Sequence, residues 1–235
     1  MDSYPTTERS RVKRLHLRGH YDKKTVFAIL DAAILAHIGY VLDGQPFVTP
    51  TAFWREGERL YWHGSAASRM LRGQAAGVPV CVTVTHMDGF VLARSGFHHS
   101  MNYRSVMAFG RAALVEDAAE KRKAMDIFVD RLFPGRTATL RQPNAQELKA
   151  TSLIGMTIEE ASAKLRTGMP VDDEEDYKLP IWAGVLPLRT IVDAPQPDPR
   201  NLPGVNAPAD IAAYAAGERL DGVLARIYDG DANKA

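Results

Sequence analysis

The segment HGSAASR, from His63 to Arg69, has the composition of an anion-binding site. It lies between a strand-like and a helix-like stretch, and the first N–H groups of a helix lack partners and carry partial positive charge. Gly64 allows the backbone to approach a ligand closely, while Ser65 and Ser68 supply hydroxyl donors. Arg69 can bind two phosphate oxygens at once. These residue types, in this order, predict a phosphate site.

The same segment also fits a purely structural role, with Ser65 as an N-cap and Arg69 as a surface side chain. Two common nucleotide-binding motifs are excluded, because the segment has neither the Gly-Lys-Ser/Thr ending of a P-loop nor the GxGxxG pattern of a dinucleotide fold. The residues alone leave the choice between an anion site and a capped helix open.

Two further features could contact a flat heterocyclic ligand. The stretch Val48 to Thr51 contains Pro50, which removes a backbone donor and marks a strand edge where neighbouring N–H and C=O groups stay free. A strand-edge proline without any ligand explains this stretch equally well. Trp182 is a large amphipathic ring that can cover a cofactor or cap a core.

A polar cluster, FHHSMNYRSV, occupies residues 97–106. Loops held by a rigid sheet often carry binding groups, so ligand contact and loop hydrogen bonding are both open here. Successive side chains of an extended chain point to opposite faces, so His98 and His99 cannot easily share one metal ion. No third ligand with suitable spacing is evident, and no metal site is expected.

Composition narrows the class of protein. The 235 residues include 29 Lys and Arg against 28 Asp and Glu, so the net charge of +1 gives no field that would attract nucleic acid or a membrane surface. The single Cys81 excludes an internal disulfide. The polar, basic N-terminus does not resemble a signal peptide, and no run of about 20 apolar residues is present. A cytoplasmic location is expected.

Period-two hydrophobic patterns and Asp-Gly turns predict an antiparallel β fold. Six strands are expected within about eighty residues, at 34–41, 47–54, 59–63, 80–86, 90–95 and 103–115, with a hairpin turn at 87–89 between the fourth and fifth. Helices are expected at 23–33, 65–76, 118–133 and 211–228, and further strands at 153–165 and 181–192. The acidic run at 172–176 is expected to be a solvated loop.

These elements predict a mainly β protein with helices, built on an antiparallel six-stranded barrel or sandwich. Residues 1–21 form a basic arm, residues 22–192 the main domain, and residues 193–235 a Pro-rich strap with a C-terminal helix.

Three stretches together resemble the pyridoxamine 5′-phosphate oxidase-like family of FMN-binding split β-barrels, namely PTAFWREGERLYWHGSAASRML, PVCVTVTHMDGFVLARSGFHHSMNYRSVMAFGRA and LPIWAGVLPL. Within that family the chain is most similar to the flavin-nucleotide-binding branch, which is related to the nitroimidazole-resistance reductases. The resemblance extends from about Asp22 to Val192.

The resemblance implies a homodimer with FMN at the subunit interface. Phosphate contacts would come from the YWHGSAASRM segment, the flavin ring edge would lie on Val48 to Thr51, and Trp182 would come from the partner chain. The cofactor-binding residues so implied are Val48, Thr49, Pro50, Thr51, His63, Gly64, Ser65, Ser68, Arg69, Asn102, Tyr103, Arg104, Ser105 and Trp182.

The expected activity is NAD(P)H-dependent reduction of a small aromatic or nitro-type acceptor through the flavin, with His63 as the proton donor, because its usual pKa of about 6.5 allows both protonation states. The Arg and His groups with which vitamin-forming oxidases bind pyridoxal phosphate are not found around Trp182, so that activity is not expected. The alternative is a non-catalytic flavin or haem carrier, or a sensor, on the same barrel.

Overall fold

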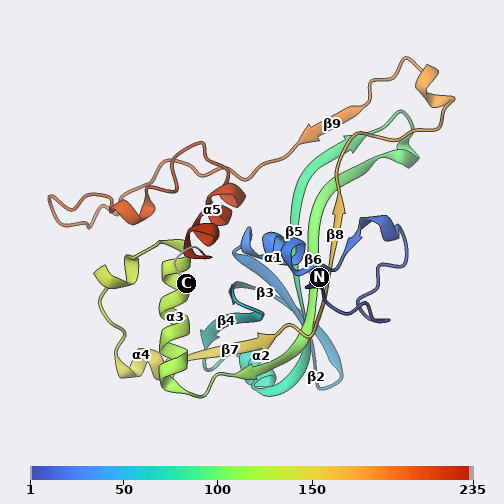
Figure 1. Cartoon of the computed structure of the whole chain (residues 1–235). Coiled ribbons are helices and arrows are strands. Elements are labelled where there is room, and N and C mark those ends of the chain that lie inside the picture. Colours follow the sequence, from blue (N-terminus) through green and yellow to red (C-terminus); the bar gives the residue numbers. More distant parts are fainter. Residues whose placement is uncertain (1, 233–235) are drawn as a thin grey trace.

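The computed structural model describes the backbone of residues 2–232, and six of its strands form a closed ring (Figure 1). Every neighbouring pair around this ring is antiparallel, and the pairing of β5 with β6 closes it. The ring order is β2 (Leu35–Leu42), β3 (Gln45–Glu56), β4 (Arg59–Ser65), β7 (Thr151–Thr157), β6 (Ser100–Leu114) and β5 (Ala76–Leu92). The predicted antiparallel six-stranded split barrel is therefore confirmed.

The remaining elements extend or cover this ring. Beyond it the sheet continues through β8 (Glu160–Arg166) to β1 (Gly19–His20) on one side and to β9 (Gly184–Pro187) on the other. The helices are α1 (Lys23–Asp31), α2 (Arg69–Gln74), α3 (Ala118–Leu132), α4 (Ala145–Ala150) and α5 (Leu220–Ala232). None of the helices in the described part of the chain is long and apolar enough to cross a membrane.

The first meander forms as its turn residues predict. Asp43 and Gly44 both adopt positive φ, at 51° and 74°, as a tight hairpin between β2 and β3 requires. Gly57, at φ 56°, makes the next turn into β4. Asp22 is the N-cap of α1, since its side chain accepts a hydrogen bond from the backbone N–H of Thr25.

The predicted hairpin turn at 87–89 is wrong. β5 continues through it as a single strand from Ala76 to Leu92, and the pairing with β6 shifts register between Met87 and Gly89. Gly89 faces β9 closely, since a Cβ atom there would lie 2.8 Å from the carbonyl oxygen of Leu186. The Asp-Gly pair therefore marks a bulge and a close approach, and the chain reverses only at 93–99.

Two predicted elements are divided differently in the structure. The helix predicted at 65–76 covers only Arg69–Gln74, because the ladder with β7 holds the chain extended as far as Ser65. The strand predicted at 153–165 is two strands, β7 and β8. They separate at Ile158 and Glu159, whose N–H groups donate to the carbonyls of Glu58 and Phe109. Tertiary pairing thus overrides local pattern in both places.

The C-terminal part also departs from the prediction. The strand predicted at 181–192 is only β9, four residues long, and it lies at the sheet edge as Pro187 requires. The helix predicted at 211–228 begins at Leu220 instead, because the preceding residues form turns with Gly217 at φ 89°. The acidic run at 172–176 lies outside the strands, but Asp172 is buried.

Two apolar clusters hold the barrel together. The barrel interior is filled by side chains such as Trp62, Leu60 and Ile154, and the buried indole N–H of Trp62 donates to Gln74 at 2.9 Å. A second cluster lies between the outer face of β3 and β4 and helix α3. Because alternate residues face opposite sides, His63 points with Tyr61 towards this outer cluster.

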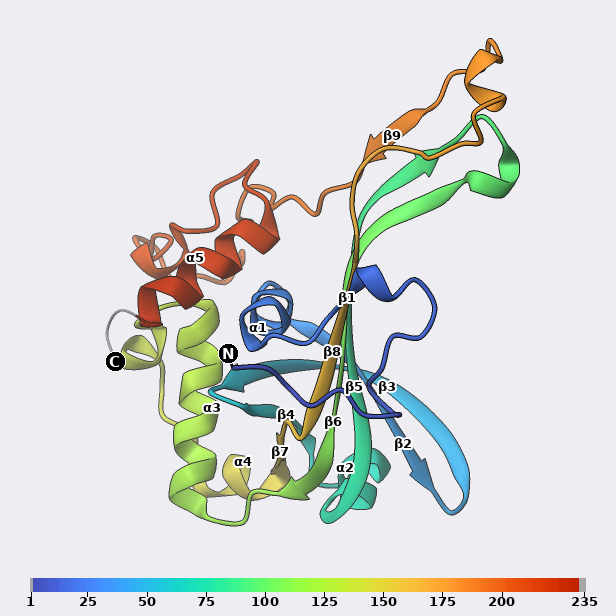
Figure 2. The same ribbon diagram turned by 45° about the vertical axis from the view of Figure 1, so that its right-hand side comes forward.

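The β5–β6 hairpin extends beyond the barrel as a long arm, with β9 as its third strand (Figures 1 and 2). One face of the arm is covered, and Val91 on it is buried. On the other face Phe90 lies beside Met101 and Leu186 across the strands, and these side chains are 45%, 49% and 50% exposed. The arm therefore presents an apolar ladder to solvent.

Candidate functional site

The barrel opens between β3 and β4. Their pairing ends at Phe53 and Trp62; beyond that point β4 pairs only with β7, and the first part of β3 only with β2. The two unpaired edges contain Val48–Thr51 and Gly64–Ser65. The ring of Phe47 bridges the opening, because the guanidinium of Arg69 lies 4.6 Å from its centre. Two of the predicted groups of site residues therefore meet at this opening.

The predicted phosphate segment contains hydrogen-bond donors that are not used within the described structure. Ser68 caps α2 by position, but its hydroxyl makes no capping hydrogen bond. The Ser65 hydroxyl accepts from the backbone N–H of Ala67 at 3.2 Å. Arg69 is exposed, and its guanidinium pairs with no carboxylate of the described residues. Since α2 has only six residues, its dipole is small, and an anion here would depend on these side chains rather than on the helix.

Glycine at position 64 is required by packing. A Cβ atom there would lie 3.1 Å from Cδ1 of Leu71 in α2, which is tighter than ordinary contact. The helix therefore sits directly against the end of β4, which brings Arg69 back over the opening. The sequence prediction of a close approach at Gly64 is explained by helix packing, and it does not require a ligand.

His63 lies in an aromatic environment beside this segment. Its ring centre is 5.9 Å from that of Trp54 and 5.2 Å from that of Phe128 in α3. The Nδ1 atom is buried and has no hydrogen-bond partner within the described part of the chain. Burial lowers the pKa of His63, so the imidazole is neutral at neutral pH. A neutral imidazole with a free nitrogen is suited to accept a hydrogen bond or to bind a metal ion.

The β3 side of the opening is polar and partly solvated. Val48 is 68% exposed, and the hydroxyl of Thr49 lies 3.3 Å from that of Tyr40. Thr51 donates to the carbonyl oxygen of Ala52 at 3.4 Å. Pro50 lies opposite His37 of β2, and at this position β3 has no second partner strand, as expected of a proline in a strand.

The other predicted site residues lie elsewhere in the same chain. Asn102 to Ser105 occupy the arm end of β6, whereas the end of β6 that reaches β7 is Leu114. Asn102 donates to the carbonyl oxygen of Gly168 at 3.0 Å, and Ser105 donates to that of Lys164 at 3.3 Å. Half-buried Tyr103 lies between Asn102 and Arg104 on the same strand.

Trp182 lies on the segment just before β9, and Figure 1 shows β9 on the arm, away from α2. It is 65% exposed, and its ring packs closely over Gly184. Within one chain, therefore, Trp182 and residues 102–105 lie away from the opening at the HGSAASR segment.

Arg104 lines a cavity of about 210 Å³ that sequence reasoning missed. Its guanidinium binds both oxygens of Asp88, at 2.9 and 2.7 Å, and one oxygen of Asp221, at 3.0 Å. Arg189 and Arg219 also line the cavity, so three guanidinium groups face two carboxylates and leave one positive charge. The site favours an anionic group. Its residues come from five distant places in the chain, Ala32, 85–88, 104, 188–190 and 219–221, and no local pattern links them.

Comparison with known protein families gives one match. Residues 22–165 match the family model described as pyridoxamine 5′-phosphate oxidase. The matched region contains all of the barrel strands and both edges of the opening. A search of curated proteins finds no significant match.

Two solved structures are similar along nearly the whole chain. A flavocytochrome from Azotobacter vinelandii is 50% identical, with a TM-score of 0.86, and the match covers 91% of this chain and 100% of that one. A protein from Mycobacterium smegmatis described as binding FAD and haem is 38% identical, with a TM-score of 0.81, and the match covers 86% and 98% of the two chains. The similarity therefore includes the arm and the C-terminal segment as well as the barrel.

Proposed function

The chain belongs to the pyridoxamine 5′-phosphate oxidase family, and on this premise we propose that it is a flavin-binding redox protein that also holds a haem. The observation that carries the proposal is the 50% identity to a flavocytochrome all of whose length is matched. When bound, the flavin supplies hydride and single-electron chemistry and the haem supplies single-electron chemistry. The residues of this chain bind the cofactors, orient them and exclude water.

The flavin phosphate is proposed to bind at the opening between β3 and β4. The uncommitted hydroxyl of Ser68 and the unpaired guanidinium of Arg69 fit an anion there. The free edge formed by Val48–Thr51 fits the ring, because unpaired backbone groups can hydrogen-bond the edge of a heterocycle. His63, the first residue of the HGSAASR segment, would stand next to the bound flavin.

The sequence predicts FMN, whereas one of the two full-length relatives is described as an FAD protein. We propose FAD, since that relative aligns with 86% of this chain, including residues outside the barrel. Heat release of the flavin, followed by chromatography against FMN and FAD standards, distinguishes the two. Recovery of FMN alone would refute the choice of FAD and leave flavin binding intact.

His63 is the residue we propose as the haem ligand. Burial keeps its imidazole neutral, and its Nδ1 has no partner. The same lowered pKa leaves little imidazolium at neutral pH, which disfavours the proton-donor role expected from the sequence. Trp54 and Phe128 supply the apolar surroundings that a haem requires.

The matched control for this assignment is His86, which is also half-buried with a pKa lowered by burial, but whose Nε2 donates to the carbonyl oxygen of Ile29 at 3.0 Å. His63→Ala is expected to lose the haem Soret band, and His86→Ala to keep it. A full Soret band in His63→Ala would reject His63 as the ligand.

A homodimer is proposed as the working form. The exposed ladder of Phe90, Met101 and Leu186 is a continuous apolar face of the kind that a partner covers. Trp182 and residues 102–105, which one chain holds away from its own opening, would then serve the site of the partner. Sedimentation of the wild type and of Phe90→Glu tests this, with a dimer expected for the first and a monomer for the second.

NAD(P)H is proposed as the electron donor, and a small aromatic or nitro-type molecule as an acceptor. The excess positive charge of the cavity around Arg104 supports an anionic donor. Arg189, whose side chain donates only to the carbonyl oxygens of Leu188 and Asp88, is free to contact a phosphate. Arg189→Ala should raise the KM for NADPH without changing the flavin content. Oxidation of pyridoxamine phosphate is not proposed.

The direct test of the proposed function is the absorption spectrum of the purified protein after incubation with FAD and haemin. Flavin bands together with a Soret band are expected. Flavin bands alone would reduce the proposal to a flavoprotein, and a colourless protein would refute it.

A further inference from the structure

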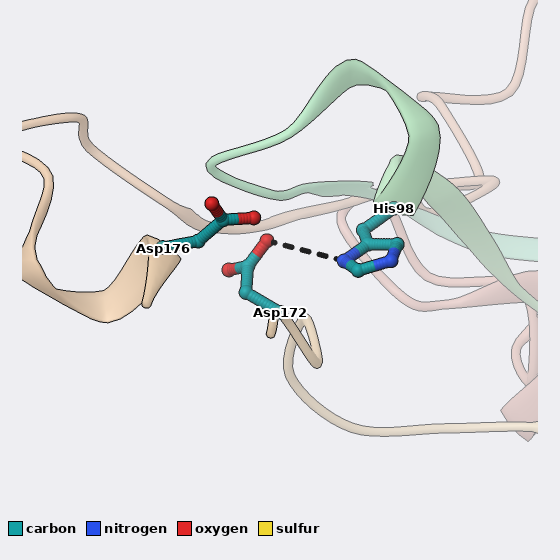
Figure 3. Close-up of side chains that lie close together, drawn as sticks. All are labelled: His98, Asp172 and Asp176. Atoms are coloured by element: carbon teal, nitrogen blue, oxygen red, sulfur yellow. Dashed lines mark ion pairs between the residues drawn. The ribbon is translucent and has the colours of Figure 1, made fainter. Parts of the chain in front are cut away.

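Three side chains from distant parts of the chain converge at the tip of the arm (Figure 3). His98 lies at the end of the short helix η2 (Gly96–His98), in the connection between β5 and β6. Asp172 and Asp176 belong to the acidic segment that crosses the arm before β9. One nitrogen of the imidazole and one oxygen of each carboxylate all lie within 4.8 Å of one another.

The charges at this point are unbalanced. The side chain of Asp172 is fully buried, and its carboxylate accepts from the backbone N–H of Arg94 at 2.9 Å and from the guanidinium at 3.1 Å. Asp176 is half-buried, and its carboxylate makes no hydrogen bond or ion pair with the described residues. The guanidinium of Arg94 therefore pairs with Asp172 alone, and among the described residues no cation pairs with Asp176. Like charges held together at a partly buried place favour a cation.

The imidazole supplies a second, independent observation. Nδ1 of His98 is buried without a hydrogen-bond partner and lies 3.8 Å from Oδ1 of Asp172. Its neighbour His99 differs, because its Nδ1 is bonded to the carbonyl oxygen of Ser95 at 2.9 Å. Leaving a buried polar atom unpaired costs about 1–3 kcal/mol, so a bound group that satisfies Nδ1 is favoured.

We propose that His98, Asp172 and Asp176 bind a divalent transition-metal ion of the Zn²⁺ type. One imidazole nitrogen and two carboxylate oxygens form a ligand set that zinc accepts, with water in the fourth position. Ligand atoms of a tetrahedral zinc site are about 3.4 Å apart, given metal–ligand distances near 2.1 Å. Closure from the present spacing requires a shift of Asp176, which lies in a single short turn, η4 (Asp176–Lys178).

The ion would act as a structural clip on the arm. Asp172 already ties the crossing segment to Arg94, and Tyr177 packs 4.8 Å under the same guanidinium. A metal bound by His98 and Asp176 would add a second tie between this segment and the hairpin tip. No metal site is expected from the sequence, because His98 and His99 point to opposite faces and no third ligand lies at a suitable spacing. The two carboxylates reach the site through tertiary folding alone. This inference does not rest on the proposed cofactors.

The test is isothermal titration of Zn²⁺ into the full-length protein after dialysis against a chelator. Saturable binding of a single ion per chain is expected. His98→Ala and Asp176→Asn should each weaken binding by at least about tenfold, since even outer-shell partners of metal ligands contribute that much. His99→Ala, which removes the adjacent imidazole, should bind as the wild type does.

Thermal unfolding with and without Zn²⁺ distinguishes a loss of metal binding from a folding defect, because the Tm without zinc reports on folding alone. Zinc should raise the Tm of the wild type and of His99→Ala, and leave that of His98→Ala unchanged. Absence of saturable binding in the wild type would overturn the proposal, and so would equal affinities for His98→Ala and His99→Ala in proteins that unfold at the same temperature.

Discussion

Replacing Arg69 with alanine is expected to weaken flavin binding strongly without disturbing the barrel. Arg69 is exposed and has no carboxylate partner, so its full charge is available to a phosphate. A hydrogen bond to a charged group is worth about 1.5–3 kcal/mol, which corresponds to a roughly 12- to 160-fold rise in Kd. The contact with Phe47 at 4.6 Å adds at most about 1 kcal/mol and is already present in the free protein.

The assay is quenching of flavin fluorescence on titration into the flavin-free protein. Arg111→Ala removes the same charge from an exposed position on β6 and should leave the Kd unchanged. Arg69→Lys keeps the charge but loses the planar fork, so it should fall between Arg69→Ala and the wild type. An unchanged Kd for Arg69→Ala, with FAD and with FMN, would refute the assignment of the phosphate to this segment.

Three further substitutions test the physical account of the fold. Gly110→Ala should lower the free energy of unfolding by about 1–3 kcal/mol, because its Cβ would lie 2.3 Å from the carbonyl oxygen of Thr157; urea denaturation at wild-type stability would contradict this. Arg55→Ala should cost up to about 3–5 kcal/mol, since buried Asp31 would lose its two-point partner and keep only the weaker influence of Tyr228 and Arg131, and the double variant with Asp31→Leu should recover part of that loss in the same assay. Burial lowers the pKa of His63 below its unfolded value, so the stability that the neutral ring contributes is present above about pH 6.5 and is lost as the pH falls through the folded pKa. The Tm of His63→Gln should therefore change less between about pH 7 and pH 5 than the Tm of the wild type. Identical Tm profiles would contradict the burial of a neutral His63.

The strands of the barrel were predictable because their residues carry the information locally. Asp43 and Gly44 require the tight turn that joins β2 to β3, and the alternation along 80–86 fixes which side chains face the core. The Asp-Gly pair at 88–89 has the same local chemistry as a hairpin turn. This pair forms a bulge because β5 is paired with β6 along one edge and with β9 along the other. The local sequence contains no information about these two partner strands.

The candidate site residues also differ in how far they can be predicted from local sequence. The residues from His63 to Arg69 are consecutive, so their composition alone suggested an anion site, with a capped helix as the alternative. The cavity around Arg104 is also lined by Arg189 and Arg219, which come from much later in the chain. The proposed zinc site likewise combines His98 with two carboxylates more than 70 residues later in the sequence. Such sites exist only after the chain has folded, and a single sequence gives no spacing rule for them.

We propose that the chain is a redox protein in which electrons enter a flavin bound at the opening between β3 and β4 and pass to a haem. Anaerobic addition of NADPH or NADH to the protein loaded with both cofactors tests it directly. The account predicts loss of the flavin absorption, followed by the spectrum of reduced haem. Bound flavin that stays oxidised with both donors, or a protein that takes up no flavin, would contradict it.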